Sequence, residues 1–259
     1  MEPIRAILLP GSILPAQLAY GDLIEDLAPG VDAIAKDLEL YERDEPPPGW
    51  SLDTEVDGVL READAFGWET FHLVGYSGGG AAALAVAAEH PERLLSLALL
   101  EPAWAGSWDW SPAHEEVWRK YRELEELPPD ELILEFTRLG VKPDVVLPPP
   151  VEGAPPPWMA RRPAGVRAFL ETFKSYDLDR EKLAAFRKPV FYALGGLSNP
   201  DAYGEIADRL AKVFPDFHIE VFEERHHFDP PHRAEPLRLA VLLRELWDRA
   251  EGREHQVTL

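Results

Sequence analysis

The sequence predicts an α/β fold: a mostly parallel sheet flanked by helices, with a helical cap insertion before the last two strands. Three observations predict it. Short apolar runs alternate with segments of helical spacing in both outer parts of the chain, as in a sheet buried on both faces. One of these runs leads through a glycine-rich turn into an alanine-rich helix. Between residues 104 and 187 the strand rhythm stops and only helical spacing remains.

The predicted elements follow in order along the chain. The first part carries strands at 4–9, 32–37, 71–76 and 94–100 and helices at 17–27, 51–66 and 81–89. The insertion carries helices at 112–126, 130–139, 164–174 and 179–186. After Pro189 the spacing predicts strands at 190–194 and 218–222 and helices at 200–214 and 235–251. Asn199 is the expected N-cap of the helix that begins at Pro200.

The length and the composition indicate one globular domain. A chain of 259 residues can bury one sizeable core, so we expect a core of residues 1–103 and 188–259 with an insertion at 104–187. Hydrophobic residues make up 46% of the chain, which argues against disorder. The longest apolar stretch, 81–88, is too short to span a bilayer.

The charge and the missing cysteines limit the partners and the compartment. A formal net charge of -21 repels nucleic acid and anionic lipid, so we expect a small-molecule substrate and neither of those partners. The chain has no cysteine, and its N-terminus lacks the basic region of a signal peptide. We therefore expect a cytoplasmic protein, either a monomer or a homodimer.

The most informative segment is a serine held in a glycine turn. Gly75 and Gly79 flank Ser77 at two-residue offsets, between the strand at 71–76 and the alanine-rich helix. A turn this tight strains its serine and leaves no room for bulky neighbours. The segment resembles the nucleophile elbow of the α/β-hydrolase superfamily, in the form G-x-S-x-G. The resemblance implies a serine nucleophile under a helical cap.

A glycine turn between a strand and a helix can also hold a dinucleotide. Gly78, Gly80 and Ala83 fit the pattern G-x-G-x-x-A, and Glu101 follows at about the distance where that fold has an acidic residue. That fingerprint usually opens the first βαβ unit, whereas about seventy residues of α/β pattern come before this one. We favour the hydrolase elbow, which needs no cofactor.

A serine nucleophile needs a base that is oriented by an acid. The segment Glu224-Arg225-His226-His227-Phe228 follows the last strand and resembles the family's G-x-G-H-F loop, with departures at positions 224 and 226. The resemblance assigns the base to His227, in preference to His226. The alternative is a metal site, but prolines 230 and 231 break any helical face and no ligand spacing is recognisable; its candidate ligands are His226, His227, Asp229 and His232.

Two carboxylates could orient the histidine. The family usually places its acid after the strand at 190–194 as G-x-x-D, where this chain has Ser198. Asp201 comes three residues later, in a first helical turn where the helix dipole already explains a carboxylate. Glu101 ends the strand that follows the elbow helix, a position used by some family members. Glu101 is therefore favoured, with Asp201 as the alternative acid.

The oxyanion formed by attack of Ser77 on a carbonyl needs two N–H donors. In the family they come from the residue after the nucleophile, here Gly78, and from the loop after the first strand. The segment Leu9-Pro10-Gly11-Ser12 resembles that H-G-x loop, with proline in place of histidine. The second donor is then Ser12, or else Ile13.

These residues and the resemblance predict a cofactor-independent serine hydrolase of the carboxylic-ester type. The substrate is expected to be a small apolar ester or a related carbonyl compound, and no metal is expected. Five of the eight tryptophans fall in or near the insertion, and the pocket is expected to include Tyr76, Trp104 and Trp108, although cap helices also need apolar core. The alternative is a non-catalytic protein on the same fold that binds a small molecule. The unusual acid position and histidine loop favour that interpretation.

Overall fold

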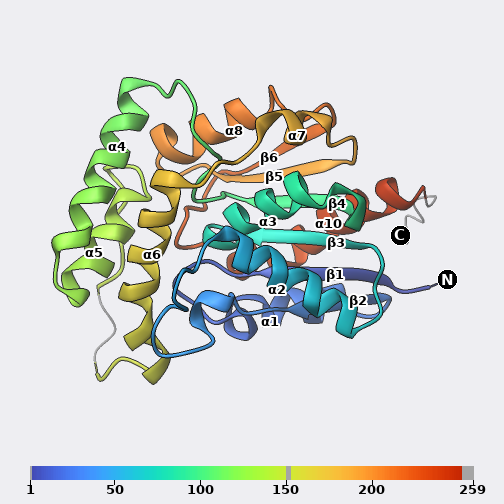
Figure 1. Ribbon diagram of the computed structural model, residues 1–259, viewed down its shortest axis with the longest axis horizontal. Helices are drawn as coiled ribbons and strands as arrows, with labels where there is room; N and C mark the ends of the chain where they lie inside the picture. The colour runs from blue at the N-terminus through green and yellow to red at the C-terminus, as the bar shows by residue number, and fades with distance from the viewer. Residues whose placement is uncertain (1, 150–152, 253–259) are drawn as a thin grey trace.

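One parallel sheet forms the centre of the molecule (Figure 1). The computed structural model describes residues 2–149 and 153–252. The strand order is β2-β1-β3-β4-β5-β6, and every neighbouring pair is parallel. The predicted α/β class is confirmed. The strands are β1 (Ile4–Leu9), β2 (Val31–Ala35), β3 (Phe71–Tyr76), β4 (Leu94–Leu100), β5 (Val190–Gly195) and β6 (Phe217–Phe222).

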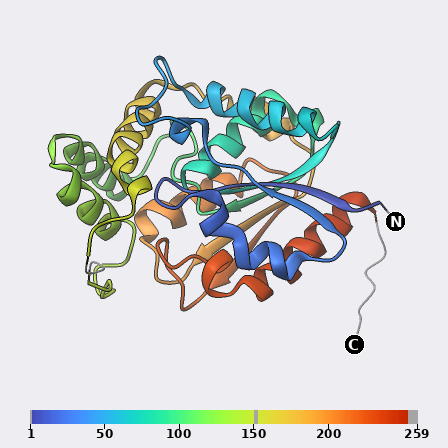
Figure 2. The same ribbon diagram turned by 90° about the horizontal axis from the view of Figure 1, so that it is seen from below.

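Long helices cover both faces of this sheet, as Figure 2 shows from below. Side chains of a strand point alternately to its two sides, so each face builds its own apolar core. In β1, Leu8 packs into one core and Ile7 into the other. The first core lies under α1 (Ala16–Leu27) and α10 (Pro236–Glu251), and the second under α2 (Leu52–Ala65) and α3 (Gly78–Glu89).

Shorter helical segments connect these elements. The helix predicted over 200–214 opens with a π-helical turn, Pro200–Gly204, and ends at Leu210. Asn199 caps it as predicted, because its side-chain oxygen accepts the N–H of Asp201 at 3.1 Å. No helix in the described part of the chain is long and apolar enough to cross a membrane. The other short segments are α7 (Arg180–Ala185), α8 (Glu205–Leu210), α9 (Pro231–Ala234) and 3₁₀ turns at Glu39–Tyr41, Pro91–Arg93, Leu124–Glu126 and Pro157–Arg161.

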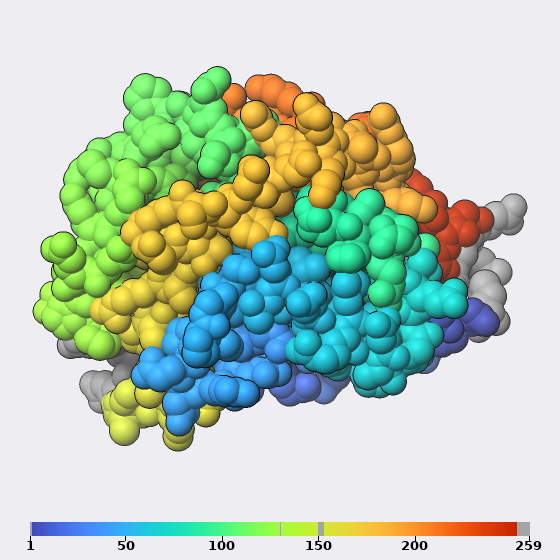
Figure 3. Space-filling model, viewed as in Figure 1, coloured from blue at the N-terminus to red at the C-terminus, as the bar shows by residue number. Residues whose placement is uncertain are grey.

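Three helices of the insertion stand over the end of the sheet where the strands terminate (Figure 1). They are α4 (Pro112–Glu123), α5 (Pro129–Leu139) and α6 (Arg162–Ser175). Figure 3 shows α6, in yellow, against the blue segment that follows β2. The contact includes the Arg162 guanidinium, 4.0 Å above the ring of Tyr41. The last insertion helix, α7, packs against α3 and adds Leu183 to the core, so the boundary at 187 stays a prediction.

The strand order places two loops together above the sheet. The chain runs from β1 outward to β2, and from β3 through β4 and β5 to β6 on the other side. The loops after β1 and β3 therefore open side by side where the direction of winding reverses. Ligands of open α/β sheets bind at this point. Residues 10–15 and Ser77 lie there.

Candidate active site

The serine of the glycine turn has a strained backbone. Ser77 lies between β3 and α3 with φ 52° and ψ -117°, a backbone conformation that residues other than glycine rarely adopt. The helix begins at Gly78, not at Ala81 as predicted, because close packing of the turn outweighs the low helix propensity of glycine. A Cβ on Gly79 would lie 2.5 Å from the carbonyl oxygen of Pro10, so the turn cannot carry a side chain there.

Ser77 contacts a histidine, which in turn contacts a glutamate. The Nε2 atom of His227 lies 2.9 Å from Ser77 Oγ, and its Nδ1 atom lies 3.0 Å from Glu101 Oε2. An ionised carboxylate only accepts hydrogen bonds, so Nδ1 carries the proton and Nε2 is the free base. The other carboxylate oxygen, Oε1, accepts the N–H of Gly195 at 2.7 Å. Both oxygens of Glu101 are thereby fixed in place.

The parallel pairing of β3 with β4 explains why Glu101 reaches the site. Tyr76 pairs with Leu100, so the next residues, Ser77 and Glu101, leave the sheet side by side. Asp201, the alternative acid, is exposed in the π-helical turn, and its backbone carbonyl accepts from His114 Nδ1 at 2.7 Å. The structure brings Glu101 to the histidine and leaves Asp201 outside the site.

The two adjacent histidines, His226 and His227, make different contacts. The ring of Tyr203 stacks on His227 at 4.0 Å, and the hydroxyl of Tyr76 donates to the carbonyl of His227. His226 instead caps its own turn, where Nδ1 accepts two backbone N–H groups at 3.1 Å. Burial lowers the pKa of His226. The sequence gives no local signal for Tyr203, which is distant from His227 along the chain and meets it only in the fold.

The four side chains considered as metal ligands point to separate partners. Asp229 pairs with Arg225 at 2.7 Å, and His232 lies between the rings of Tyr20 and Tyr76. Within residues 2–149 and 153–252, no three His, Cys, Asp or Glu side chains are grouped so that they could hold a metal ion.

The predicted oxyanion donors are Gly78 and either Ser12 or Ile13. Gly78 is the first residue of α3, so its N–H has no acceptor within the helix. The N–H groups of Ser12 and Ile13 also make no backbone hydrogen bond in the described chain. The hydroxyl of Tyr41 donates to the Ser12 carbonyl at 3.0 Å and holds this loop in place. Amides without a backbone acceptor therefore occur in both segments that meet at Ser77, the start of α3 and the loop after β1.

The same contacts bear on the dinucleotide alternative. A Cβ on Gly78 would lie 2.7 Å from the ring of Phe169 and 2.9 Å from Ser12 Oγ, so α6 and the loop after β1 cover the start of α3. The carboxylate of Glu101 is occupied by His227 and Gly195. These contacts disfavour a dinucleotide at the start of α3, because its pyrophosphate would need the space that Phe169 and Ser12 occupy and its ribose would need the carboxylate of Glu101.

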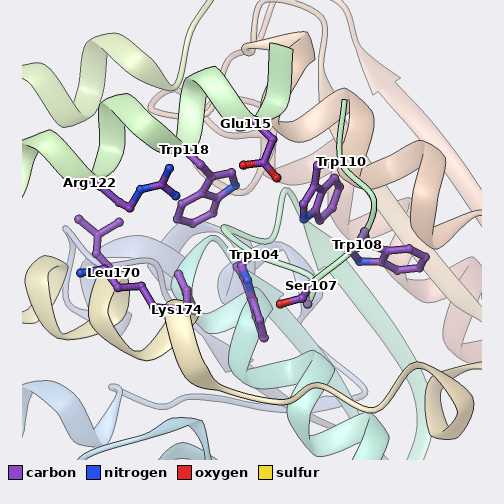
Figure 4. A pocket seen from close by; sticks show the side chains of 11 residues that line it. Trp104, Ser107, Trp108, Trp110, Glu115, Trp118, Arg122, Leu170 and Lys174 are labelled. Carbon is purple, nitrogen blue, oxygen red and sulfur yellow. The ribbon is translucent and has the colours of Figure 1, made fainter. Parts of the chain in front are cut away.

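Two cavities are lined by residues of α4 and α6 together with residues of the loops that follow the strands. The inner one, of about 30 Å³, reaches the site through Ser12, Ala103 and Tyr203. The outer one, of about 360 Å³, is lined by Trp104 and Trp108 among others (Figure 4). The predicted pocket residue Tyr76 lines neither cavity, because its hydroxyl is directed to the histidine loop. Burial raises the pKa of Tyr121, in the inner wall, to about 12.

Solved structures show that this fold occurs in known esterases. The chain superimposes on a thermophilic esterase from Thermogutta terrifontis with a TM-score of 0.67 and 20% identity, covering 96% of this chain and 91% of that one. For the carboxylesterase CesB of Bacillus subtilis the values are 0.65 and 17%, covering 94% and 83%. At this identity the likeness concerns the fold alone.

Sequence comparisons give one short match and one long match. The protein named "Putative carbamate hydrolase RutD" from Caulobacter segnis is 38% identical over 55 residues, which is 21% of each chain. The match thus spans about a fifth of the length of that relative. The family described as alpha/beta hydrolase fold matches residues 7–228, most of the chain. Together with the parallel sheet and the serine elbow, this match shows that the chain belongs to the α/β-hydrolase family.

Proposed function

We propose that this protein is a serine hydrolase that cleaves a carboxylic ester through an acyl-enzyme intermediate. The observation that carries the proposal is the run of contacts from Ser77 Oγ through the His227 ring to Glu101, which begins at a strained serine. No cofactor takes part in the proposed reaction.

The first half of the reaction forms the acyl-enzyme. Ser77 Oγ attacks the carbonyl carbon while its proton passes to His227 Nε2. The N–H of Gly78 and that of Ser12 or Ile13 stabilise the oxyanion, and Glu101 stabilises the imidazolium through Nδ1. The bond to the leaving oxygen then breaks, and His227 gives its proton to the departing alcohol.

The second half restores the enzyme. Water attacks the acyl carbon as His227 takes one of its protons. The bond from the carbonyl carbon to Ser77 Oγ breaks, the carboxylic acid departs, and the proton returns to Ser77 Oγ. Each turnover consumes one ester and one water and releases one acid and one alcohol.

The inner cavity supports a small acyl or alkoxy group next to the serine. Its wall is mainly apolar and aromatic, and its tyrosines stay neutral because burial raises the pKa of Tyr203 well above its ordinary value. A cavity of about 30 Å³ favours short chains over long ones. The structural similarity to a thermophilic esterase and to a carboxylesterase supports the same bond type.

The match to RutD favours carbamates as a second substrate class. RutD is named as a carbamate hydrolase, and the proposed array would attack a carbamate carbonyl in the same way as an ester carbonyl. A panel of p-nitrophenyl acetate, p-nitrophenyl octanoate and an aryl carbamate separates the two classes by their kcat/KM values.

Labelling with a small alkyl fluorophosphonate, followed by digestion and mass spectrometry, tests the nucleophile. We expect one adduct, on the peptide with Ser77, and none in Ser77→Ala. A folded protein that turns over no ester or carbamate and takes up no label would contradict the proposal and favour the binding-protein alternative.

A further inference from the structure

The outer cavity is built mainly from aromatic rings at the mouth of the site. Figure 4 shows Trp104 and Trp118 on facing sides of it, with Trp110 closing one end. Trp104 comes from the loop after β4, and Trp118 from α4. Flat aromatic walls of this kind bind planar apolar groups by stacking and edge contacts.

Three side chains are shared between the walls of the outer and the inner cavity. Phe173 of α6 stacks on Trp104 at 5.1 Å and meets the edge of Trp118 at 6.0 Å. Phe173, Trp118 and Leu170 line both cavities, so the two spaces adjoin. A ligand with one short arm at the serine would therefore place its other arm among the tryptophans.

The four tryptophans of this wall differ in whether an arginine lies over the ring. Arg180 lies 4.5 Å above Trp108, and Arg209 lies 5.8 Å from the ring centre of Trp110. Over Trp104 and Trp118 no Lys or Arg lies in the described chain. Two of the four rings thus already have nitrogen-bearing partners, which disfavours the cavity as a cage for a cationic ligand.

Charged side chains make the two ends of the outer cavity differ in electrostatic potential. Glu115, Trp118 and Arg122 follow one another on a single face of α4, at spacings of three and four residues. Lys174, also in the wall, is paired with Glu125 at 2.9 Å and Glu171 at 2.8 Å. Arg122 has no carboxylate partner in the part of the chain that the structure describes. One end of the cavity therefore offers an uncompensated guanidinium, and Glu115 makes the other end repel anions.

We infer that the outer cavity binds a planar aromatic carboxylate, with its ring between Trp104 and Trp118 and its carboxylate on Arg122. This inference deepens the proposed function and depends on it for one point, that the bound group is one arm of an ester. The substrate class is then a hydroxy-substituted aromatic acid whose hydroxyl oxygen carries a short acyl group and whose carboxylate is free. Because the chain carries a net charge of -21, the anion is held only where Arg122 offsets the general repulsion.

Binding of 2-naphthoate and its neutral isostere 2-naphthamide, by calorimetry at fixed ionic strength, tests the inference. The protein used is Ser77→Ala, so binding is measured without turnover. We expect 2-naphthoate to bind about three- to tenfold tighter than the amide, the range for an ion pair that is partly exposed. Equal affinities would overturn the inference.

Matched variants locate the site. Arg122→Gln should abolish the preference for 2-naphthoate. Lys120→Gln should retain it, because Lys120 lies on the same helix, carries the same charge and lines no part of this cavity. Glu115→Gln should increase the preference. A preference that survives in Arg122→Gln would overturn the assignment.

Turnover separates this inference from the proposed function. With the unmodified serine, kcat/KM for 4-acetoxybenzoate should exceed that for 4-acetoxybenzamide by a similar factor, and Arg122→Gln should equalise them. Absence of turnover with the 2-naphthoate preference intact would reject the hydrolase and retain the binding site. Turnover of both esters at equal rates, without that preference, would reject the binding site and retain the hydrolase.

Discussion

Two Ser–His–Glu arrays lie at opposite ends of the same two strands. One is the candidate active site, beyond the C-terminal ends of β3 and β4. In the other, His72 on β3 lies 2.8 Å from the hydroxyl of Ser96 on β4 and 3.1 Å from a carboxylate oxygen of Glu251 on α10. The contact distances in the two arrays are alike. Hydrogen-bond contacts alone therefore do not mark a reactive serine.

The arrays differ in backbone, in access and in nearby donors. Ser77 and Glu101 are the two non-glycine residues of the described chain that have positive φ. Ser96 pairs with His72 inside the sheet, is fully buried and lines neither cavity. Ser77 is also buried and lines neither cavity itself, but Ser12 and Ala103, which lie beside it, line the inner one. A strained turn and preorganised donors prepare a serine for chemistry, whereas a strand position serves packing.

The largest expected difference is in turnover. Ser77→Ala should lower kcat/KM for an ester about 10⁴-fold, because the nucleophile and the charge it develops are both lost. Ser96→Ala should leave kcat/KM within about twofold, because this hydroxyl contacts no reacting group. Steady-state kinetics on the two variants, each checked for folding by circular dichroism, gives the comparison. Equal losses would mean that the two arrays act together.

Substitutions of the two candidate acids, Glu101 and Asp201, should also differ in their effect on turnover. Glu101→Gln should lower kcat by about 10²- to 10⁴-fold, since an amide cannot stabilise the imidazolium and can impose the wrong tautomer. Asp201→Asn should leave kcat within about twofold. The conservative variants keep shape and hydrogen-bonding capacity, so the measured quantity is the effect of charge. A collapse in Asp201→Asn alone would move the acid to the π-helical turn.

Local patterns predict the active-site array better than they predict its surroundings. The elbow strand, its glycines and β4 are contiguous runs, and parallel pairing then places Glu101 beside Ser77. The start of α3 was predicted three residues late because glycine has low helix propensity, which tertiary packing overrides at Gly78. The position of His72 within an apolar strand predicts a structural role for it. Its contact with Glu251 on α10 could not be predicted, because the two residues are far apart in the sequence.

The outer cavity could not be derived from the sequence. Tryptophan density indicates a pocket or a cap core equally well, and only the fold shows which rings already have cationic neighbours. In the sequence, nothing distinguishes Arg122 from the other charged residues of an amphipathic helix. Its place at the cavity follows from the orientation of α4 against α6, which depends on contacts far apart in sequence.

Acid should destabilise the protein through His232, which packs on Tyr76 at the active-site end of the sheet. His72 has partners for both ring nitrogens, whereas neither nitrogen of His232 has a hydrogen-bond partner in the described structure. Burial, with smaller contributions from Arg233 and His227, lowers the pKa of His232 from 6.5 to about 3. Between these values the unfolded chain binds one proton more than the folded chain. Stability is therefore retained above pH 6.5 and lost as pH falls toward 3.

His232→Phe isolates this contribution. The phenyl ring can occupy the space between Tyr20 and Tyr76 without titrating. Between pH 7.5 and pH 5, the unmodified protein should lose about 2 kcal/mol more unfolding free energy than the variant. Urea denaturation at the two pH values measures the difference, and parallel losses would show that His232 takes up its proton in the folded state.

The smallest expected effect concerns the backbone of the two serines. Ser77→Gly should be more stable than Ser77→Ala by about 1 kcal/mol, because glycine adopts φ 52° without a Cβ clash. At Ser96 the order should reverse by roughly 0.5–1 kcal/mol, since glycine weakens a strand interior. All four variants lose the hydroxyl, so the difference within each pair reports the backbone. Greater stability of the alanine variant at both positions would mean that the turn stores no strain, and the nearby inner cavity and the free amides would then be the remaining distinctions between the arrays.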